Sequence, residues 1–304
     1  MVTGKPKQHS TRTASAVSVL TSQERCELVA VQPFVSPVRR ARHRLRTRVS
    51  EYPALYLSFA RHKYPGPSPE VISSDTELVI DGYTRSATTF GVYAFQLCQQ
   101  KPVRLAHHLH APAQLIAAAR SGIPALLLIR EPQGAILSQL IREPGVTLPD
   151  ALVAYSRFYA CLVPYLDSFV IGEFEQVTSD FGAVIRRLNE RFGTSFAEFA
   201  HTDVSARECF ELIKHRGTLS KVLLGFESGV VTKDQMRSEL QTLARQQKRA
   251  EGKEAWIPSE DRIRSKAALR AQWLQPGLAR MRDRAEDVYL EFRAASRWPA
   301  EPVV

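Results

Sequence analysis

The segment Gly82–Phe90 (GYTRSATTF) combines hydroxyl groups with one basic side chain, which is the composition of an anion-binding loop. It follows the apolar run Leu78–Ile80 and precedes an apolar stretch, an order that predicts a buried strand, a tight turn at Gly82 and a helix. Ser86, Thr88 and Thr89 would then present hydroxyls and backbone N–H groups at the helix N-terminus, where anions are favoured. The segment predicts a phosphate site; the alternative is an ordinary well-capped βα unit.

The position of the basic residue separates this loop from those that bind a Mg-triphosphate. In such loops, G-x-x-x-x-G-K-[ST], the lysine reaches the β- and γ-phosphates and the next hydroxyl binds Mg²⁺. Counted from Gly82, the matching places hold Ala87, Thr88 and Thr89, and the loop cation is Arg85. We therefore expect a less charged anion, held by an arginine, hydroxyls and a helix N-terminus.

Two more polar segments follow runs that predict strands. His107–His110 (HHLH) comes after the β-like VRLA, and Arg130 follows Ala125–Ile129 (ALLLI), with Ser138 eight residues further on. A continuous aliphatic run is typical of a strand buried on both faces of a parallel sheet, and ligands of such sheets collect beyond the carboxyl ends of the strands. The sequence predicts that the Gly82 loop, these histidines and Arg130 meet at one edge.

The order of the elements predicts the fold class. Apolar runs alternate with helical stretches, which favours right-handed βαβ crossovers and a three-layer α/β fold, a parallel sheet flanked by helices, of the P-loop nucleotide-binding type. A further helix is expected over residues 149–163, a strand over 168–174, and an amphipathic helix opened by Ser179 as N-cap. Periodicity weakens over residues 216–257, where we expect only a polar helix near 234–250 and consider a mobile cover over a ligand site.

Charge is concentrated at the N-terminal end of the 304-residue chain. Residues 1–63 hold 12 of its 41 Lys and Arg residues but 3 of its 31 Asp and Glu residues. We expect residues 1–50 to be a basic, disordered or loosely attached segment and 51–300 a single α/β domain. The six arginines of Arg39–Arg48 could contact nucleic acid, an anionic surface or an acidic partner; the alternative is a solvated helix face or mobile arm.

Hydropathy and cysteine usage indicate a compartment. No run of 18 apolar residues occurs and no signal-peptide h-region opens the sequence, so a soluble, cytoplasmic protein is expected. Its four cysteines are widely spaced and form no CxxC pair, which favours reduced thiols: Cys26, Cys98, Cys161 and Cys209.

Taken together, Tyr83–Phe90, the Arg130-x₇-Ser138 spacing and the segment Ala106–Leu109 (AHHL) resemble the PAPS-dependent sulfotransferases, in particular bacterial-type members. That family has a P-loop-like [YF]-P-[KR]-S-G-T-T-[WF] segment, an R-x₇-S element and, in cytosolic members, a K-T-H-L-P segment with a catalytic histidine. The resemblance covers roughly residues 76–200.

The resemblance implies a role for each matched residue. Arg85 would stabilise the sulfuryl group in transfer, and Arg130 with Ser138 would bind the 3′-phosphate of 3′-phosphoadenosine-5′-phosphosulfate (PAPS). The general base would be His108, with His107 and His110 as alternatives. The 5′-phosphate would lie on the rest of the loop: Ser86, Ala87, Thr88 and Thr89. The acceptor would be a hydroxyl or amine of a carbohydrate or small molecule; no metal and no specific nucleic acid are expected.

The sequence also departs from the family pattern. Thr84, Ala87, Ala106 and Phe174 stand where the family has Pro, Gly, Lys and Tyr. The late R-K-G loop that grips the 3′-phosphate has only a poor match in 215–217 (HRG), and Arg262 with Lys266 is another source of positive charge. Two other functions remain open: a P-loop phosphotransferase or NTPase, and a catalytically silent nucleotide-binding protein of the same fold.

Overall fold

In the computed structural model, residues 35–64, 70–246 and 260–296 are described. Four strands form one parallel sheet in the order β2-β1-β3-β4. The strands are β1 (Leu78–Gly82), β2 (Leu105–His107), β3 (Ala125–Ile129) and β4 (Val170–Glu173). The predicted α/β class with a parallel sheet is confirmed.

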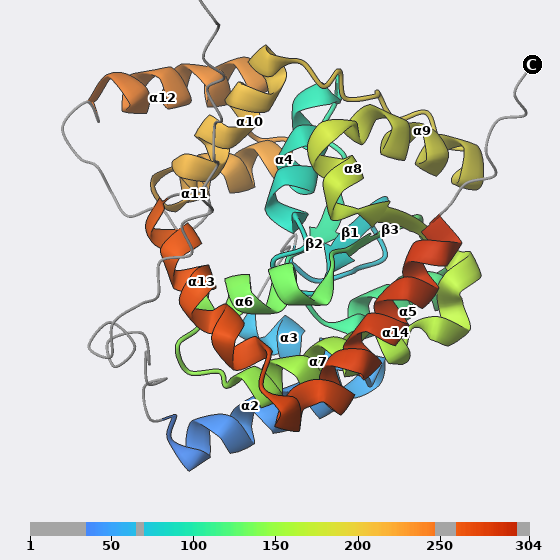
Figure 1. Cartoon of the computed structure of the whole chain (residues 1–304). Helices are drawn as coiled ribbons and strands as arrows, with labels where there is room; N and C mark the ends of the chain where they lie inside the picture. The colour runs from blue at the N-terminus through green and yellow to red at the C-terminus, as the bar shows by residue number, and fades with distance from the viewer. Residues whose placement is uncertain (1–34, 65–69, 247–259, 297–304) are drawn as a thin grey trace, which may run out of the picture. The chain divides into compact units, whose positions relative to one another are not determined.

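Helices cover both faces of the sheet (Figure 1). One face packs on α5 (Pro112–Ser121), α7 (Leu148–Ala160) and α14 (Ala279–Ser296), and the other on α4 (Thr88–Cys98) and α9 (Phe181–Phe192). Strand residues alternate between the two cores: Leu127 belongs to the first and Leu128 to the second. Both faces are buried, which is why these strands read as unbroken aliphatic runs.

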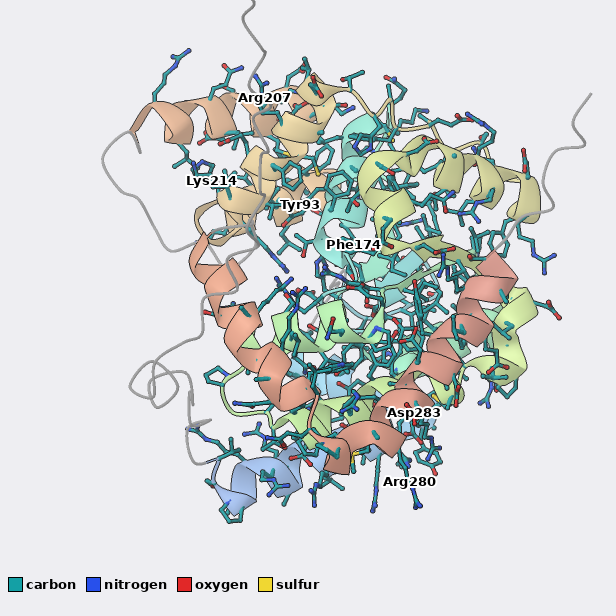
Figure 2. The ribbon with its side chains drawn as sticks, in the orientation of Figure 1. Tyr93, Phe174, Arg207, Lys214, Arg280 and Asp283 are labelled. Carbon is teal, nitrogen blue, oxygen red and sulfur yellow. The ribbon has the colours of Figure 1, made fainter. Side chains whose placement is uncertain are left out.

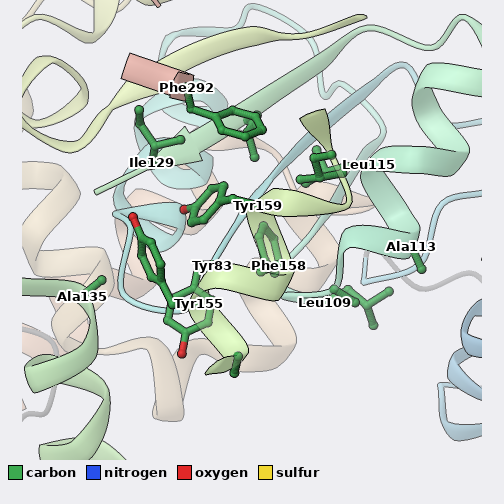
Figure 3. Close-up of a cluster of buried hydrophobic side chains, with 14 of the residues drawn as sticks. Tyr83, Leu109, Ala113, Leu115, Ile129, Ala135, Tyr155, Phe158, Tyr159 and Phe292 are labelled. Carbon is green, nitrogen blue, oxygen red and sulfur yellow. The ribbon is translucent and has the colours of Figure 1, made fainter. Parts of the chain in front are cut away.

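Aromatic side chains fill the first core beneath the carboxyl ends of the strands (Figure 3). Tyr155 and Tyr159 of α7 lie with their rings tilted at a centroid distance of 4.9 Å, and Tyr83 meets Tyr155 edge-on at 5.0 Å. The Tyr159 hydroxyl donates to the carbonyl of Leu128 at 3.1 Å. The helix expected over 149–163 is present as α7, its aromatic side chains pack in the core, and Tyr159 also supports the end of β3.

The chain beyond β4 contains more helix than the sequence predicts. A short helix, α8 (Phe174–Ser179), leads into α9, and Asp180, not Ser179, is the N-cap of α9: its carboxylate accepts from the Ala183 N–H at 3.2 Å. Three helices lie within or just before residues 216–257, the region of weak periodicity. The last of them overlaps the polar helix expected near 234–250. They are α10 (Asp203–Lys214), α11 (Arg216–Glu227) and α12 (Lys233–Gln246).

The remaining helical elements lie outside the groups named above. They are α3 (Pro53–Lys63), α6 (Pro132–Arg142), α13 (Glu260–Trp273) and two short 3₁₀ turns, Val163–Ser168 and Pro276–Leu278. None of the helices in the described ranges is long and apolar enough to cross a membrane. Cys98, Cys161 and Cys209 are free thiols; Cys26 lies outside the described residues.

Residues 37–49 of the basic segment form a docked helix, α2 (Pro37–Val49). Arg40 Nε and Arg44 Nε donate to the two oxygens of the Asp150 carboxylate on α7, at 3.0 and 2.7 Å. The Asp150 side chain is 4% exposed, so it is a buried anion that two arginines neutralise. The arginine run is therefore held against α7 rather than loosely attached; residues 1–34 of the expected N-terminal segment lie outside the described residues.

Candidate functional site: an anion-binding cavity at the sheet edge

The loop between β1 and α4 is sharply folded at two non-glycine residues. Arg85 and Ala87 have φ of 71° and 68°, in the left-handed region that ordinary side chains enter at a cost of roughly 1–2 kcal/mol. A tight turn was expected at Gly82, but the structure shows another reason for glycine there. A Cβ at this position would lie 2.3 Å from the Leu128 carbonyl oxygen, so glycine lets β1 approach β3. Backbone alternating between such conformations turns successive N–H groups toward one point, which suits an anion.

A buried hydroxyl marks the helix end of the loop. Thr88, the first residue of α4, is 3% exposed, and its Oγ1 has no hydrogen-bond partner among the described residues. An unpartnered buried hydroxyl costs about 1–3 kcal/mol, so such a group points to a ligand that would satisfy it. The loop thus offers a hydroxyl, backbone N–H groups and the positive end of α4 at one place.

Arg130 is brought beside this loop from the end of β3. Its Nη1 donates to the Arg85 carbonyl at 3.2 Å, and its guanidinium lies over the Phe174 ring at 3.7 Å. Tyr155 donates its hydroxyl to the Arg130 carbonyl at 2.6 Å, which fixes the backbone where the strand ends. In Figure 2 Phe174 is labelled near the middle of the view, and Arg280 and Asp283 near its lower edge. Arg130 is therefore held by its backbone, a ring face and the loop.

Ser138 completes the connection between the loop and α6. Arg85 Nε donates to Ser138 Oγ at 2.9 Å, so the loop cation and the R-x₇-S element touch each other directly. Arg130 also pairs with Glu131, Nε to Oε2 at 3.3 Å, and burial raises the pKa of Glu131 although Arg130 opposes the shift. An anion entering this corner would meet two guanidinium groups and compete with one carboxylate.

His108 and His107 form an ordered chain that runs from the loop to α11. His108 Nε2 lies 3.0 Å from Thr89 Oγ1, His108 Nδ1 lies 2.6 Å from His107 Nδ1, and His107 Nε2 lies 3.1 Å from Glu227 Oε1 of α11. His108 is in the left-handed region, with φ of 59°. Burial, with His107, Arg216 and His110 nearby, holds the pKa of His108 well below 6.5. At neutral pH its imidazole is uncharged and can accept a proton.

His110 is anchored separately. Its Nδ1 donates to the Gly82 carbonyl at 3.0 Å, its backbone N–H donates to Asp81 Oδ2 at 3.0 Å, and Asp81 is fully buried. The bond to a carbonyl requires the proton on Nδ1 and leaves Nε2 as an acceptor when the ring is neutral. Two histidines thus present a basic nitrogen near the loop.

These groups line a single cavity of about 840 Å³. Besides its two histidines, its lining includes five basic residues and one acidic residue, Glu143, a balance that favours a ligand with several negative charges. The basic residues come from the loop, both ends of α6, α11 and α13: Arg85, Arg130, Arg142, Arg216 and Lys266. Apolar contact comes from Phe90, Phe174, Phe210 and Ile213.

Most of the residues singled out from the sequence meet here. The cavity is lined by Arg85, Ala87, Thr88, Thr89, His108, His110, Arg130 and Ser138. Ser86 is fully buried and His107 is 4% exposed, so both lie behind the cavity wall. Three cations were considered as replacements for the family's R-K-G loop at the 3′-phosphate. Two of them, Arg216 and Lys266, line the cavity, and the side chain of the third, Arg262, is not among those described.

Sequence reasoning missed three charged residues of this region. Arg142 lies one turn beyond Ser138 on the same side of α6, a spacing that would have placed it had α6 been traced further, and Glu143 is the C-cap that follows it. Glu227 has no local signal, because it is 120 positions from the histidine it contacts. Comparison of the chain with models of protein families, with curated proteins and with solved structures gives no match, so the resemblance to sulfotransferases rests on the residues named above.

Proposed function

We propose that this protein is a sulfotransferase that moves a sulfuryl group from PAPS to a hydroxyl or amine of a carbohydrate or other small molecule. The observation that carries the proposal is the contact between two sequence-distant anion-binding elements. Arg85 of the loop donates to Ser138, and Arg130 donates to the Arg85 carbonyl. A nucleotide with phosphate groups at both its 3′ and 5′ positions needs two such elements within reach of each other.

The donor fits the charges of the cavity. Arg130 and Ser138 would hold the 3′-phosphate, with Lys266 of α13 as a further cation on that side. The 5′-phosphosulfate would lie on the β1–α4 loop, where the Thr88 hydroxyl has no partner in the part of the chain that the structure describes. The fork of an arginine and the hydroxyl of a serine match phosphate oxygens, and each charge-assisted bond contributes about 1.5–3 kcal/mol.

The residues at the loop supply what transfer requires. His108 Nε2 removes the proton of the acceptor O–H or N–H, the acceptor atom forms a bond to sulfur, and the bond from sulfur to the bridging oxygen breaks. The electron pair stays on that oxygen, which leaves on 3′-phosphoadenosine-5′-phosphate. Arg85 and the α4 N-terminus stabilise the charge that develops there. Neutral His108, with a pKa below 6.5, is in the correct state for this step at pH 7.

Binding of the desulfated nucleotide tests the donor assignment without any acceptor. We expect 3′-phosphoadenosine-5′-phosphate to bind about 10- to 150-fold more tightly than adenosine 5′-phosphate by isothermal titration, which corresponds to one lost 3′-phosphate contact of about 1.5–3 kcal/mol. ATP and GTP serve as the comparison for a phosphotransferase. Equal or tighter binding of ATP would overturn the proposal.

Transfer itself is tested with PAPS carrying labelled sulfate and a panel of saccharides, phenols and amines. Wild-type protein is expected to label at least one class of acceptor, and His108→Ala to lose that activity while still binding the desulfated nucleotide. His110→Ala is the matched comparison, because His110 also presents a basic nitrogen. Tight nucleotide binding with no transfer to any acceptor would favour the catalytically silent protein instead.

A further inference from the structure

We propose that Glu227 and His107 act as a positioning pair that fixes the tautomer of His108, so that its Nε2 is the unprotonated nitrogen and faces the loop. The four groups Glu227, His107, His108 and Thr89 form one continuous hydrogen-bonded chain. The tautomer assignment stands on this geometry alone. Only its use in transfer rests on the proposed function.

The donor and the acceptor of each hydrogen bond in this chain follow from the carboxylate at one end. An ionised Glu227 can only accept, so the proton of the 3.1 Å contact belongs to His107 Nε2. A neutral His107 then has a bare Nδ1, so the proton between the two rings, 2.6 Å apart, belongs to His108 Nδ1. His108 Nε2 is left as an acceptor, and the Thr89 hydroxyl donates to it. One carboxylate thereby decides the state of a nitrogen two rings away.

The surroundings explain why such support is needed. The charged and titratable groups that act on His108 are His107 of β2, His110 of the next loop and Arg216 of α11. Its histidine neighbours in turn contact Glu227 of α11 and Asp81 of β1, and Tyr93 of α4 interacts with Arg216 and Glu227. Of these, Arg216 and the neighbouring histidines oppose a positive charge on His108, in addition to burial. Glu227 is the carboxylate that reaches His108 through a hydrogen-bonded ring, with its side chain 11% exposed.

The chain also offers a path for the proton that His108 takes up. When Nε2 gains a proton, the proton on Nδ1 can move to His107 Nδ1 along their short contact. The positive charge then lies on His107, beside the Glu227 carboxylate. Two N–H bonds form and one O–H or N–H bond of the acceptor and one N–H bond of His108 break, with no other reactant required.

The tautomer is measured on the whole protein with ¹⁵N-labelled histidine and no ligand, because protonated and bare imidazole nitrogens resonate far apart. Wild-type protein is expected to show His108 with Nδ1 protonated and Nε2 bare. In Glu227→Gln the amide can donate as well as accept, so we expect a mixed or reversed tautomer at both rings. Protonated Nε2 in the wild type, or spectra of His107 and His108 unchanged by Glu227→Gln, would overturn the proposal.

A matched control separates this effect from a general loss of a helix carboxylate. Glu211 of α10 lies 3.5 Å from His215, so Glu211→Gln also removes a carboxylate beside a buried histidine, outside the chain. This variant is expected to leave the His107 and His108 signals at their wild-type positions. Thermal unfolding of both variants shows whether each is folded, and Glu227→Asp is the conservative variant expected to restore the wild-type tautomer in part.

Kinetics then test the role in transfer. Glu227→Gln is expected to lower kcat about 10- to 100-fold, as supporting partners of a catalytic imidazole do, without changing the affinity for 3′-phosphoadenosine-5′-phosphate. Since a carboxylate favours the charged imidazole, its removal should move the acidic limb of the pH profile to lower pH. An unchanged kcat and limb would overturn the positioning role. Absence of transfer by wild-type protein would instead count against the proposed function, and the spectra would still decide the tautomer.

Discussion

Arg130 makes four contacts, and a lysine could not reproduce the geometry of the three that its guanidinium makes. Its guanidinium bonds to the Arg85 carbonyl and to Glu131 while its plane lies on Phe174, and its backbone carbonyl accepts from Tyr155. A planar fork that is already oriented loses little entropy when phosphate binds. The side chain is 15% exposed, so it is partly desolvated but still faces the cavity.

We therefore expect Arg130→Ala to weaken binding of 3′-phosphoadenosine-5′-phosphate by about 10- to 150-fold, equivalent to about 1.5–3 kcal/mol. Arg130→Lys should recover only part of this loss. Isothermal titration measures both, with Arg120→Ala as the control, because Arg120 is bound to Tyr165 outside the cavity. A loss of the same size for adenosine 5′-phosphate would show that Arg130 does not read the 3′-phosphate.

Glu131 is the anion that a phosphate at Arg130 would meet. Its carboxylate lies 3.3 Å from Arg130 Nε, and its side chain is 41% exposed. Glu131→Gln removes the negative charge and keeps the size, so we expect tighter nucleotide binding, by about two- to fivefold given the weak coupling of exposed charges. Weaker binding would mean that Glu131 holds Arg130 in position more than it repels the ligand.

His108 links the site to the acid stability of the fold. Burial and neighbouring positive groups hold its pKa well below 6.5 in the folded protein, whereas the unfolded chain titrates near 6.5. Below pH 6.5 the unfolded state therefore binds more protons, and the free energy of unfolding falls as the pH falls. Denaturant titrations from pH 7.5 to 5.5 should show a steeper loss for wild-type protein than for His108→Gln. Identical slopes would mean that His108 is not buried in its neutral form.

At the scale of the element, α2 depends on one carboxylate of α7. Asp150 accepts from Arg40, Arg44 and Thr147, and these bonds lower its pKa against the effect of burial. A lowered pKa means that the stabilisation is present above pH 3.8 and is lost as the pH falls below it. The helix has no acidic residue in its first turn and no buried side chain, so propensity alone would not hold it in place.

Asp150→Asn should destabilise the protein by about 1–3 kcal/mol and increase hydrogen exchange over residues 37–49. The loss stays below that of a fully buried pair, because Arg40 and Arg44 are 39% and 59% exposed and can be hydrated. Glu198→Gln is the control: Glu198 also meets an arginine through two bonds, but both side chains are exposed, so its loss should be under about 1 kcal/mol. Equal effects would contradict a special role for Asp150.

The same scale shows which elements a single sequence can predict. Strands β1 and β3 carry their own signal, since both faces are buried and every residue is apolar or small apart from Asp81. The helix α2 has no such signal, because its order comes from a partner more than a hundred residues away. The N-cap of α9 was misplaced by one residue because Ser179 and Asp180 are both good caps, and only the fold decides that Ser179 closes α8.

At the scale of the molecule, the sheet order brings the site together. With β1 between β2 and β3, the loops that follow these three strands are neighbours at one edge, which parallel topology predicts from sequence. The cavity walls do not follow from that rule. Arg216 of α11 and Lys266 of α13 come from opposite cores of the sheet and reach the cavity only through long-range packing. Sequence reasoning therefore predicted the residues on the loops after β1, β2 and β3 and missed Glu227 of α11, which contacts His107.

The charge of the assembled cavity leads to a prediction about the whole protein. A ligand that binds only the folded state stabilises it by about 2.7 kcal/mol at a concentration 100 times its Kd, whatever residues it touches. With five basic residues against Glu143, the effect should be largest for 3′-phosphoadenosine-5′-phosphate, smaller for ATP and smaller still for adenosine. Raising the salt from 0.05 to 0.5 M should weaken it, because screening shortens the reach of the charges. Thermal unfolding with each nucleotide measures this order. Stabilisation by adenosine equal to that by the doubly phosphorylated nucleotide, or no salt dependence, would show that the basic side chains do not form one anion site.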